Sequence, residues 1–390
     1  MDFKNYTLGV VGAGAMGSGI AQVAATAGHK VVVYDSFEGS VIRAKENLLK
    51  GLNSLVEKGK IDTTKAESIK SNIVYTSNIK DLAHSNLIIE AIVEELEIKK
   101  KLFIELETLV SSDCILASNT SSLSIASISG ACKNKERVVG IHFFNPATIM
   151  PLVEIIPSLS TSENVTKLSK SIIDSWNKVT VLAKDSPGFI VNRLARCYYS
   201  EAIRISEEGI ADYATIDWAM KTIGGFKMGP FELMDFIGND VNYRVTESVW
   251  TQFFYEPRFK PSLTQKRLFE SGNFGRKTGK GYYDYSQELP KAIEDKELAH
   301  KIFERVMCML FNEAIDAFYL RLALRADLDT AMIKGVNYPK GLLQWAEDFG
   351  VVKTYEILNG LYNEYQEERY RPCVLLKRLA KINSSEIHLE

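Results

Sequence analysis

The chain has 390 residues, 46% of them hydrophobic and 25% charged, which is ordinary globular composition and enough length for two or three domains. Its 47 basic and 49 acidic side chains give a formal charge of −2, so bulk electrostatics favour neither nucleic acid nor an anionic membrane as a partner. Five scattered cysteines without a C-x-x-C pair indicate buried, reduced thiols, and we expect no metal site. The polar first residues do not resemble a signal peptide, and no apolar run approaches the ~20 residues of a membrane span, so we expect a cytoplasmic protein.

The N-terminal half alternates apolar runs with helical stretches. Thr7–Val11 is an apolar run, Gly12–Gly19 is a glycine-rich turn, Ile20–Ala27 is small and apolar, and Val31–Tyr34 is a second apolar run. Continuous apolar runs of this length are typical of parallel strands covered on both faces. Further strands are predicted at residues 73–76, 87–91, 114–118, 138–144, 152–156 and 179–183. The pattern predicts a doubly wound α/β domain over residues 1–185.

After residue 185 the pattern becomes almost entirely helical. Ser186 followed by Pro187 resembles an N-cap with proline at the first helical position, which predicts that a helix begins there. Beyond it, residues 192–238 match residues 304–350 at a constant shift of 112, and a later stretch continues at a shift of 111. Either the helical domain is duplicated or two amphipathic helices resemble one another by coincidence. Because one register holds over so long a stretch, we predict two tandem all-α domains, residues 186–289 and 290–390, with a polar linker over 287–297.

A G-x-G-x-x-G motif follows the first strand and opens a helix. Gly12 suits the tight turn, Gly14 lets backbone N–H groups approach a pyrophosphate, and Gly17 lets helix and strand pack closely. Asp35 ends the second strand, where a carboxylate binds ribose hydroxyls and repels a 2′-phosphate. The motif therefore predicts a dinucleotide site that takes NAD rather than NADP. The alternative is a turn kept for packing alone, with Asp35 as an ordinary residue at the end of a strand.

One histidine stands apart from the other four. His142 ends a predicted strand, where α/β domains bind ligands, whereas His29, His84, His300 and His388 are predicted to be solvated. Glu154 lies twelve residues on, inside the next apolar run, so a hairpin centred near Thr148 would place the two residues opposite each other. A carboxylate there holds the imidazole in one tautomer and suits it to act as a general base. The alternative is a core histidine satisfied by a glutamate.

Two other polar features can each be interpreted as structural or as substrate-binding. The run Ser118-Asn-Thr-Ser121-Ser follows a strand and is either a helix N-cap or a set of donors to a substrate oxygen. Asn192 lies among apolar neighbours and is either a locally satisfied core residue or a substrate contact.

At this point the motifs resemble those of the L-3-hydroxyacyl-CoA dehydrogenases, including the 3-hydroxybutyryl-CoA dehydrogenases. The resemblance covers about residues 6–285. It rests on Gly12-x-Gly-x-Met-Gly-x-Gly-Ile-Ala, Ser118-Asn-Thr-Ser-Ser, His142-Phe-Phe-Asn-Pro, Pro187-Gly-Phe-Ile-Val-Asn-Arg, Met228-Gly-Pro-Phe-Glu-Leu and Gly275-Arg-Lys-Thr-Gly-Lys-Gly-Tyr, in that order.

The resemblance implies a Rossmann-like domain followed by all-α domains of the 6-phosphogluconate dehydrogenase C-terminal type. It implies reversible oxidation of (S)-3-hydroxyacyl-CoA by NAD, with His142 as base and Glu154 as its partner. Ser121 and Asn192 would hold the 3-oxygen, and Lys58 would reach the phosphates of CoA. The NAD contacts implied are Gly12, Gly14, Ala15, Met16, Gly17, Asp35, Glu94, Lys99, Ser121, Asn145 and Lys277.

The second helical copy departs from the family pattern. Glu304 stands where Asn192 does, and the glycine-lysine segment has no counterpart, so we expect this copy to be structural. Single-copy relatives pair through this domain, so the repeat is interpreted as a built-in partner, and the chain is expected to be a monomer or a homodimer. Two rival functions stay open: another hydroxyacid or sugar-acid dehydrogenase, and a nucleotide-binding structural or sensing protein without turnover. Acyl chain length and pathway are left open.

Overall fold

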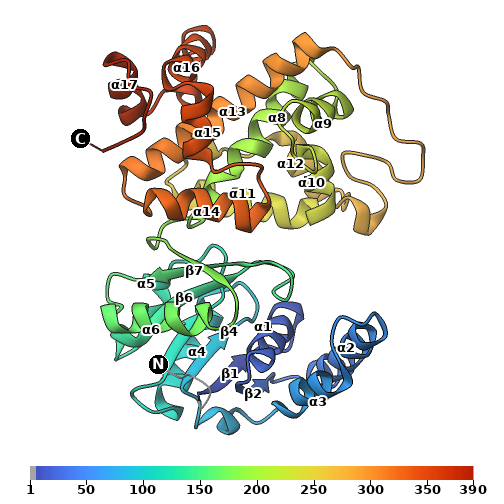
Figure 1. Ribbon diagram of the computed structural model, residues 1–390, viewed down its shortest axis with the longest axis vertical. Helices are drawn as coiled ribbons and strands as arrows, with labels where there is room; N and C mark the ends of the chain where they lie inside the picture. Colours follow the sequence, from blue (N-terminus) through green and yellow to red (C-terminus); the bar gives the residue numbers. More distant parts are fainter. Residues whose placement is uncertain (1–5, 390) are drawn as a thin grey trace. The chain divides into compact units, whose positions relative to one another are not determined.

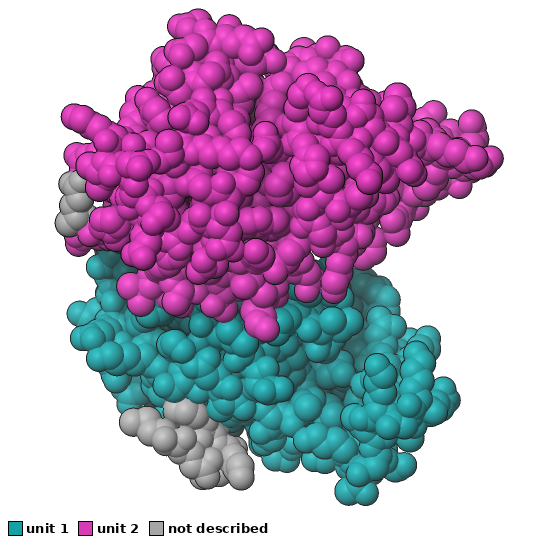
Figure 2. Space-filling model, turned by 45° about the horizontal axis from the view of Figure 1, so that its top comes forward, with its two compact units in different colours: residues 1–186 teal, residues 187–390 magenta. Residues whose placement is uncertain are grey.

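The computed structural model describes residues 6–389. The chain forms two compact units, residues 1–186 and 187–390, shown in teal and magenta in Figure 2. Among the described residues, no helix is both long enough and apolar enough to cross a bilayer.

The first unit is built on one eight-stranded sheet (Figure 1). Its strand order is β3-β2-β1-β4-β5-β6-β7-β8, in which the first six strands in sequence are parallel, β6 and β7 are antiparallel, and β7 and β8 are parallel. The order from β3 to β6 is that of a dinucleotide-binding fold, which confirms the predicted fold class. The strands are β1 (Thr7–Val11), β2 (Lys30–Tyr34), β3 (Ile73–Thr76), β4 (Leu87–Glu90), β5 (Ile115–Ser118), β6 (Val138–Phe143), β7 (Leu152–Pro157) and β8 (Val179–Leu182).

Helices cover this sheet and seal an aliphatic core. The core is formed by valine, isoleucine, leucine and alanine side chains of the strands together with the inner faces of α1, α2, α3 and α6. The helices are α1 (Ala15–Thr26), α2 (Glu38–Glu57), α3 (Thr63–Ser71), α4 (Leu96–Leu109), α5 (Ile125–Ser129) and α6 (Glu163–Asp174), with short 3-10 turns η1 (Ile79–Leu82) and η2 (Lys135–Arg137).

The second unit is helical and contains both predicted copies. The first copy contains α7 (Val191–Leu194), α8 (Arg196–Glu207), α9 (Tyr213–Thr222), α10 (Pro230–Ile237), α11 (Asn239–Gln252) and α12 (Leu263–Glu270), with η3 (Pro257–Phe259) and η4 (Arg276–Thr278). The second contains α13 (Lys296–Tyr319), α14 (Arg325–Val336), α15 (Leu342–Phe349), α16 (Val351–Tyr365) and α17 (Val374–Lys381), with η5 (Glu368–Tyr370). Shifting α10 by 112 and α12 by 111 reproduces the bounds of α15 and α17.

The two copies also share a packing device. Asp217 accepts hydrogen bonds from the backbone N–H groups of Phe231 and Glu232 at the start of α10, and Asp329 accepts them from Leu343 and Gln344 at the start of α15. In each copy a glycine lies against this aspartate so closely that a Cβ would come within 2.3 Å of it. The similarity of the copies therefore extends to buried contacts, which coincidence does not explain.

One local prediction was wrong. No helix begins at Pro187; residues 187–190 form a turn and α7 begins at Val191. Gly188 and Phe189 have φ values of 73° and 47°, and this left-handed conformation is incompatible with a right-handed helix. The linker predicted over 287–297 is confirmed as an irregular segment, which ends where Asp295 accepts hydrogen bonds from the N–H groups of Glu297 and Leu298 and α13 begins at Lys296.

Candidate active site

The glycine-rich turn has the geometry that its sequence predicts. Gly12 has φ 104°, and a Cβ there would lie 2.6 Å from the Ala91 carbonyl oxygen. A Cβ on Gly17 would lie 1.9 Å from the Gly12 carbonyl oxygen, so α1 and the turn pack too closely for any side chain. Gly14 differs, because a Cβ there would meet no atom within 4 Å. Packing therefore explains Gly12 and Gly17, whereas the open space above Gly14 suits a ligand at the N-terminus of α1.

Asp35 connects the end of β2 to this turn. Its Oδ2 accepts a hydrogen bond from the Ala13 N–H at 2.8 Å, and its Oδ1 accepts one from the Phe37 N–H at 3.0 Å. The carboxylate is half-buried and lies beside the turn, as a contact to ribose hydroxyls requires.

A cleft of about 480 Å³ borders the turn within the first unit. Gly14 and Ala15 line one part of it, Arg43 and Asn47 of α2 another, and Asn145 lies on its edge. Asn145 is thus brought next to the glycine turn from more than a hundred residues away. Met16 is partly buried and packs against the apolar core.

A buried ionic cluster follows β4. Glu90 is 0% exposed and lies 2.5 Å from the Lys99 ammonium, which is itself 1% exposed. Glu90 also accepts a hydrogen bond from the Ser118 hydroxyl at 2.6 Å. The sequence analysis missed Glu90, although a carboxylate at the end of the apolar run Leu87–Glu90 was a usable signal.

Glu94 continues this cluster towards the surface. Its Oε2 lies 3.2 Å from the Lys99 ammonium, and its Oε1 accepts hydrogen bonds from the Thr120 and Ser122 hydroxyls and from the Ser121 N–H. Burial alone raises the pKa of Glu94, but Lys99 and these donors outweigh it, so the pKa lies below its ordinary value. Glu94 is therefore a carboxylate that holds the Thr120–Ser122 loop. The run from Ser118 is not a helix N-cap, because Ser124 caps α5 instead.

His142 and Glu154 form a buried pair. The antiparallel register of β6 and β7 places them directly opposite each other, as predicted. Their Nδ1 and Oε2 atoms are 2.7 Å apart, and the residues are 5% and 0% exposed. A carboxylate at Nδ1 keeps the proton on that nitrogen and leaves the lone pair on Nε2. The pair is thus arranged for proton abstraction at Nε2.

Two further residues, which the sequence analysis did not assign, hold this region in place. Asn119 accepts a hydrogen bond from the Phe143 N–H at 2.8 Å and so fixes the end of β6 beside His142. Asp185 accepts hydrogen bonds from the N–H groups of Ile125 and Ala126 at the start of α5. Asn119 belongs to the run from Ser118 to Ser122, but no local pattern predicts either contact, because each joins residues far apart in the chain.

The remaining predicted residues lie at the surface or in the second unit. Lys58 caps the C-terminal end of α2 and is exposed. Asn192 lies on α7 and is half-buried. Lys277 lies on η4, with its ammonium 2.5 Å from Asp240 Oδ1.

The prediction for His29 was wrong, since it is 3% exposed and its Nδ1 lies 3.2 Å from the Tyr6 carbonyl oxygen. Burial lowers the pKa of His29. His84, His300 and His388 are exposed, as expected. The five cysteines are all buried, also as expected.

A parallel sheet with this glycine turn, an acidic residue after the second strand and a buried histidine–carboxylate pair defines an NAD-dependent dehydrogenase. A family model for the NAD-binding domain of 3-hydroxyacyl-CoA dehydrogenase matches residues 7–186. The model for the C-terminal domain of the same family matches residues 188–285 and 302–386. The chain belongs to the 3-hydroxyacyl-CoA dehydrogenase family and is an oxidoreductase that uses NAD.

The chain is also similar in sequence and structure to proteins named as hydroxyacyl-CoA dehydrogenases. The chain is 36% identical to a 3-hydroxyadipyl-CoA dehydrogenase of Escherichia coli K12, over 97% of this chain and 98% of that protein. It is 42% identical to a 3-hydroxybutyryl-CoA dehydrogenase of Clostridioides difficile, over 72% of this chain and 99% of that protein. The crystal structure of a 3-hydroxybutyryl-CoA dehydrogenase from Escherichia coli K12 has a TM-score of 0.92 at 35% identity, and the match covers 97% of this chain and 99% of that one.

Proposed function

We propose that His142 is the general base in the reversible oxidation of (S)-3-hydroxyacyl-CoA to 3-oxoacyl-CoA. The observation that carries this proposal is the 2.7 Å contact between His142 Nδ1 and Glu154 Oε2. The lone pair on Nε2 accepts the proton of the 3-hydroxyl group, and the positive charge that develops on the ring is stabilised by the buried Glu154 carboxylate. In the reverse direction the same nitrogen returns the proton to the oxygen.

The turn, Asp35 and the cleft fit a dinucleotide. Gly12, Gly14, Ala15, Met16 and Gly17 would form the pyrophosphate cradle, since space for a ligand opens above Gly14. Asp35 would bind the ribose hydroxyls, and its negative charge disfavours a 2′-phosphate. When bound, NAD supplies the acceptor for the hydride.

Five other side chains complete the proposed set. Glu94 holds the Ser121 loop, so both are proposed as cofactor contacts, and Asn145, which lines the cleft beside the glycine turn, is proposed as a third. Lys99 is paired with Glu90 and Glu94, which supports a role in fixing Glu94. Lys99 itself is also proposed as a cofactor contact. Lys277 is the remaining proposed contact.

Ser121 and Asn192 are proposed to donate hydrogen bonds to the 3-oxygen of the substrate. Charge develops on that oxygen as its proton leaves, so donors fixed in place lower the barrier. Lys58, exposed at the end of α2, is proposed to bind the phosphates of CoA. The names of the relatives include four-carbon and six-carbon acyl groups, which supports short-chain substrates, 3-hydroxybutyryl-CoA among them.

The test is an assay of acetoacetyl-CoA reduction with NADH and NADPH in parallel, together with the free keto acid. We expect turnover with acetoacetyl-CoA and NADH, and a loss of roughly 10²–10⁴-fold in His142→Gln with NADH binding retained. Near-full turnover in that variant would contradict the assignment of the base. NADH binding without turnover of any acyl-CoA would favour a sensing role instead.

We also propose that residues 186–289 and 290–390 are two copies of one domain, the second of which acts as a built-in partner of the first. Arg193 Nε lies 2.6 Å from Glu313 Oε1, and Arg305 Nε lies 2.6 Å from Glu201 Oε1. The shift of 112 residues exchanges the members of these two ion pairs. Such reciprocal pairing is the signature of a twofold interface between identical subunits. It supports a pseudo-dimer of helical domains within one chain.

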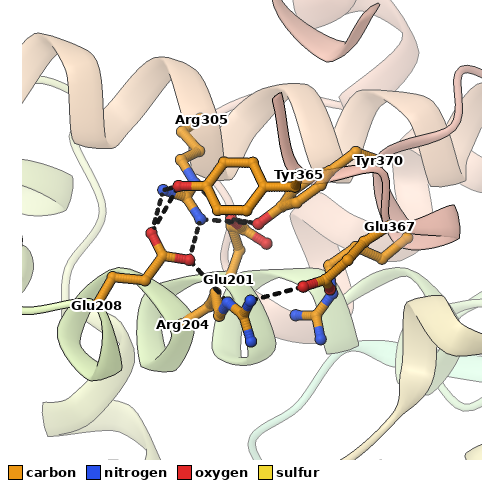
Figure 3. A network of polar contacts seen from close by, with 8 residues as sticks. Glu201, Arg204, Glu208, Arg305, Tyr365, Glu367 and Tyr370 are labelled. Atoms are coloured by element: carbon orange, nitrogen blue, oxygen red, sulfur yellow. Dashed lines mark hydrogen bonds and ion pairs between the residues drawn. The ribbon is translucent and has the colours of Figure 1, made fainter. Parts of the chain in front are cut away.

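A wider polar network surrounds one of these pairs (Figure 3). Arg305 of α13 also contacts Glu208, and the Tyr370 hydroxyl donates a hydrogen bond to Glu201. Arg204 of α8 pairs with Glu367 at 2.6 Å. Because these contacts join α8 to the second copy, they commit that face of the first copy to a partner within the chain.

Oligomeric state tests this second proposal. Deletion of residues 291–390 uncovers the α8 face of the first copy. In sedimentation experiments, the truncated protein is therefore expected to form dimers or aggregates that the intact chain does not form. A truncated protein that stays monomeric and well behaved would contradict the proposal.

A further inference from the structure

Glu90 is a fully buried carboxylate between two segments that carry proposed cofactor contacts. It ends β4, which lies between β1 and β5 in the sheet. The strand register places it beside Val11, the last residue before the glycine turn, and beside Ser118, which ends β5 and leads into the next loop. A carboxylate that is 0% exposed is costly to bury unless its oxygens are paired. The reason for an acidic residue at this position therefore lies in its contacts.

The hydrogen bonds of Glu90 join three segments of the first unit. Its Oε1 accepts hydrogen bonds from the Lys99 ammonium of α4 at 2.5 Å and from the Ile92 N–H at 2.8 Å. Its Oε2 accepts one from the Ser118 hydroxyl at 2.6 Å, and the hydroxyl oxygen of Ser118 accepts one from the Thr120 N–H at 3.2 Å. One side chain thus ties α4 and the loop after β5 to the end of β4.

Lys99 carries the effect of Glu90 to Glu94. The Lys99 ammonium also lies 3.2 Å from Glu94 Oε2, while Glu94 Oε1 accepts a hydrogen bond from the Ser121 N–H at 3.0 Å. If Glu90 loses its charge, Glu94 is the one acidic partner that Lys99 keeps among the described residues. A buried ammonium attracts its remaining carboxylate more strongly when no second one competes for it. The position of Glu94, and of the loop that it holds, therefore depends on Glu90.

This cluster lies on the side of the glycine turn opposite Asp35. Asp35 follows β2, whereas Glu90 ends β4, and β1 separates these two strands in the sheet. In a doubly wound fold the two halves of a dinucleotide lie on the two sides of this point. Since Asp35 is proposed to bind the adenosine ribose, the nicotinamide half is expected above the ends of β4, β5 and β6. The last of these strands carries His142. Glu94 and the loop after β5 are thus on the nicotinamide side.

We propose that Glu90 is a positioning residue for the nicotinamide half of NAD. It acts through Lys99 and Ser118, which hold Glu94 and the loop after β5 in place. Glu90 itself is buried beneath these groups and does not touch the cofactor. The inference rests on the proposed function, in which Glu94 and this loop contact NAD.

The test compares the binding of NADH with that of ADP-ribose, which keeps the adenosine and the diphosphate but lacks the nicotinamide. Glu90→Gln keeps the size of the side chain and removes its charge. By calorimetric titration, we expect its dissociation constant for NADH to rise roughly 10-fold and that for ADP-ribose to change less than about 2-fold. The kcat for acetoacetyl-CoA reduction should fall by up to about 10²-fold, because a nicotinamide displaced by about 1 Å reacts slowly. The matched control Glu97→Gln removes an exposed carboxylate of α4 and should change none of these values.

A double-mutant cycle with Lys99→Met tests the route. Because both substitutions break the same contact, the double variant is expected to lose little more NADH affinity than the weaker-binding single variant. The double variant also leaves no buried charge at either position, so it is expected to fold even where a single variant does not. Thermal melting identifies a variant that fails to fold, and the NADH and ADP-ribose affinities of the double variant then decide.

Three results would overturn the inference. Equal losses of affinity for NADH and ADP-ribose would assign Glu90 to the glycine turn as a whole. Unchanged affinity for both would assign it to support of the fold alone, and additive losses in the double variant would exclude the route through Lys99. Any of these results in a protein that turns over acetoacetyl-CoA overturns only this inference. Wild-type protein that binds NADH but turns over no acyl-CoA overturns the proposed function, and the two affinities still decide the role of Glu90.

Discussion

Glu154→Gln is the sharpest test of the proposed catalytic pair. The substitution keeps the size of a side chain that is 0% exposed but removes its charge. In addition, the amide nitrogen of glutamine can donate to Nδ1, and the proton then moves to Nε2, where it blocks the lone pair that the base needs. Both effects act on the pair without disturbing the glycine turn.

The expected loss follows from the geometry. Oε2 and Nδ1 are 2.7 Å apart. With charge centres about 4 Å apart and an effective dielectric constant of about 20, a carboxylate stabilises the developing imidazolium by about 4 kcal/mol. At 1.36 kcal/mol per factor of ten, the rate of the chemical step should fall about 10³-fold.

Single-turnover reduction of acetoacetyl-CoA separates this step from product release. NADH deuterated at the transferred position then shows whether hydride transfer limits the variant. The matched control is Glu163→Gln, which removes an exposed charge on α6. Loss of less than about tenfold in folded Glu154→Gln would refute the view that the carboxylate sets the tautomer and charge of His142.

Three further predictions concern stability and binding. Glu313→Gln leaves buried Arg193 and Arg258 with Asp316, 3.6 and 3.4 Å away, as the only carboxylate that they still share among the described residues. Urea unfolding should therefore show a loss of about 3 kcal/mol, the lower end for a broken buried ion pair. The exposed control Glu297→Gln should lose less than about 0.5 kcal/mol, and equal losses would contradict the buried-pair argument. Burial raises the pKa of Asp217 to about 7, above its ordinary value of about 4, so the folded protein binds a proton that the unfolded chain has released. Its contribution is therefore complete below about pH 4 and falls by up to about 1.4 kcal/mol per unit as the pH rises to 7, a slope that Asp217→Asn should lack. Lys58→Met should raise the KM for acetoacetyl-CoA roughly 2- to 5-fold, but it should not raise the KM for a substrate that lacks the CoA phosphates. The control Lys30→Met should change the KM of neither substrate.

Local patterns predicted much of the first unit correctly. All eight strands were found within a residue or two, because buried parallel strands appear as unbroken apolar runs. The opposition of His142 and Glu154 followed from hairpin arithmetic, since residues equally far from a turn face each other. The sequence repeat also indicated the duplication, because two copies of one domain keep similar residues at their equivalent buried positions.

The two failures have different physical causes. Ser186-Pro187 has the composition of a helix start, but the backbone at Gly188 is left-handed and the helix begins later. His29 was expected at the surface because it follows a glycine in a turn, yet Trp176, far along the chain, covers it. A contact from a distant part of the chain decided the burial of His29, whereas the local backbone conformation at Gly188 and Phe189 delayed the start of the helix.

The sequence by itself therefore determined the fold class, the glycine turn and the family, because each depends on residues that are close in the chain or on a repeat. It also predicted that His142 and Glu154 lie opposite each other. The tertiary structure alone showed that Glu90 and Lys99 neutralise each other, that Glu94 holds the Ser121 loop, and that two reciprocal ion pairs join the helical copies. A charge in a sequence does not reveal its counterion, because the energy of a buried ion depends on which distant groups the fold brings within hydrogen-bonding distance.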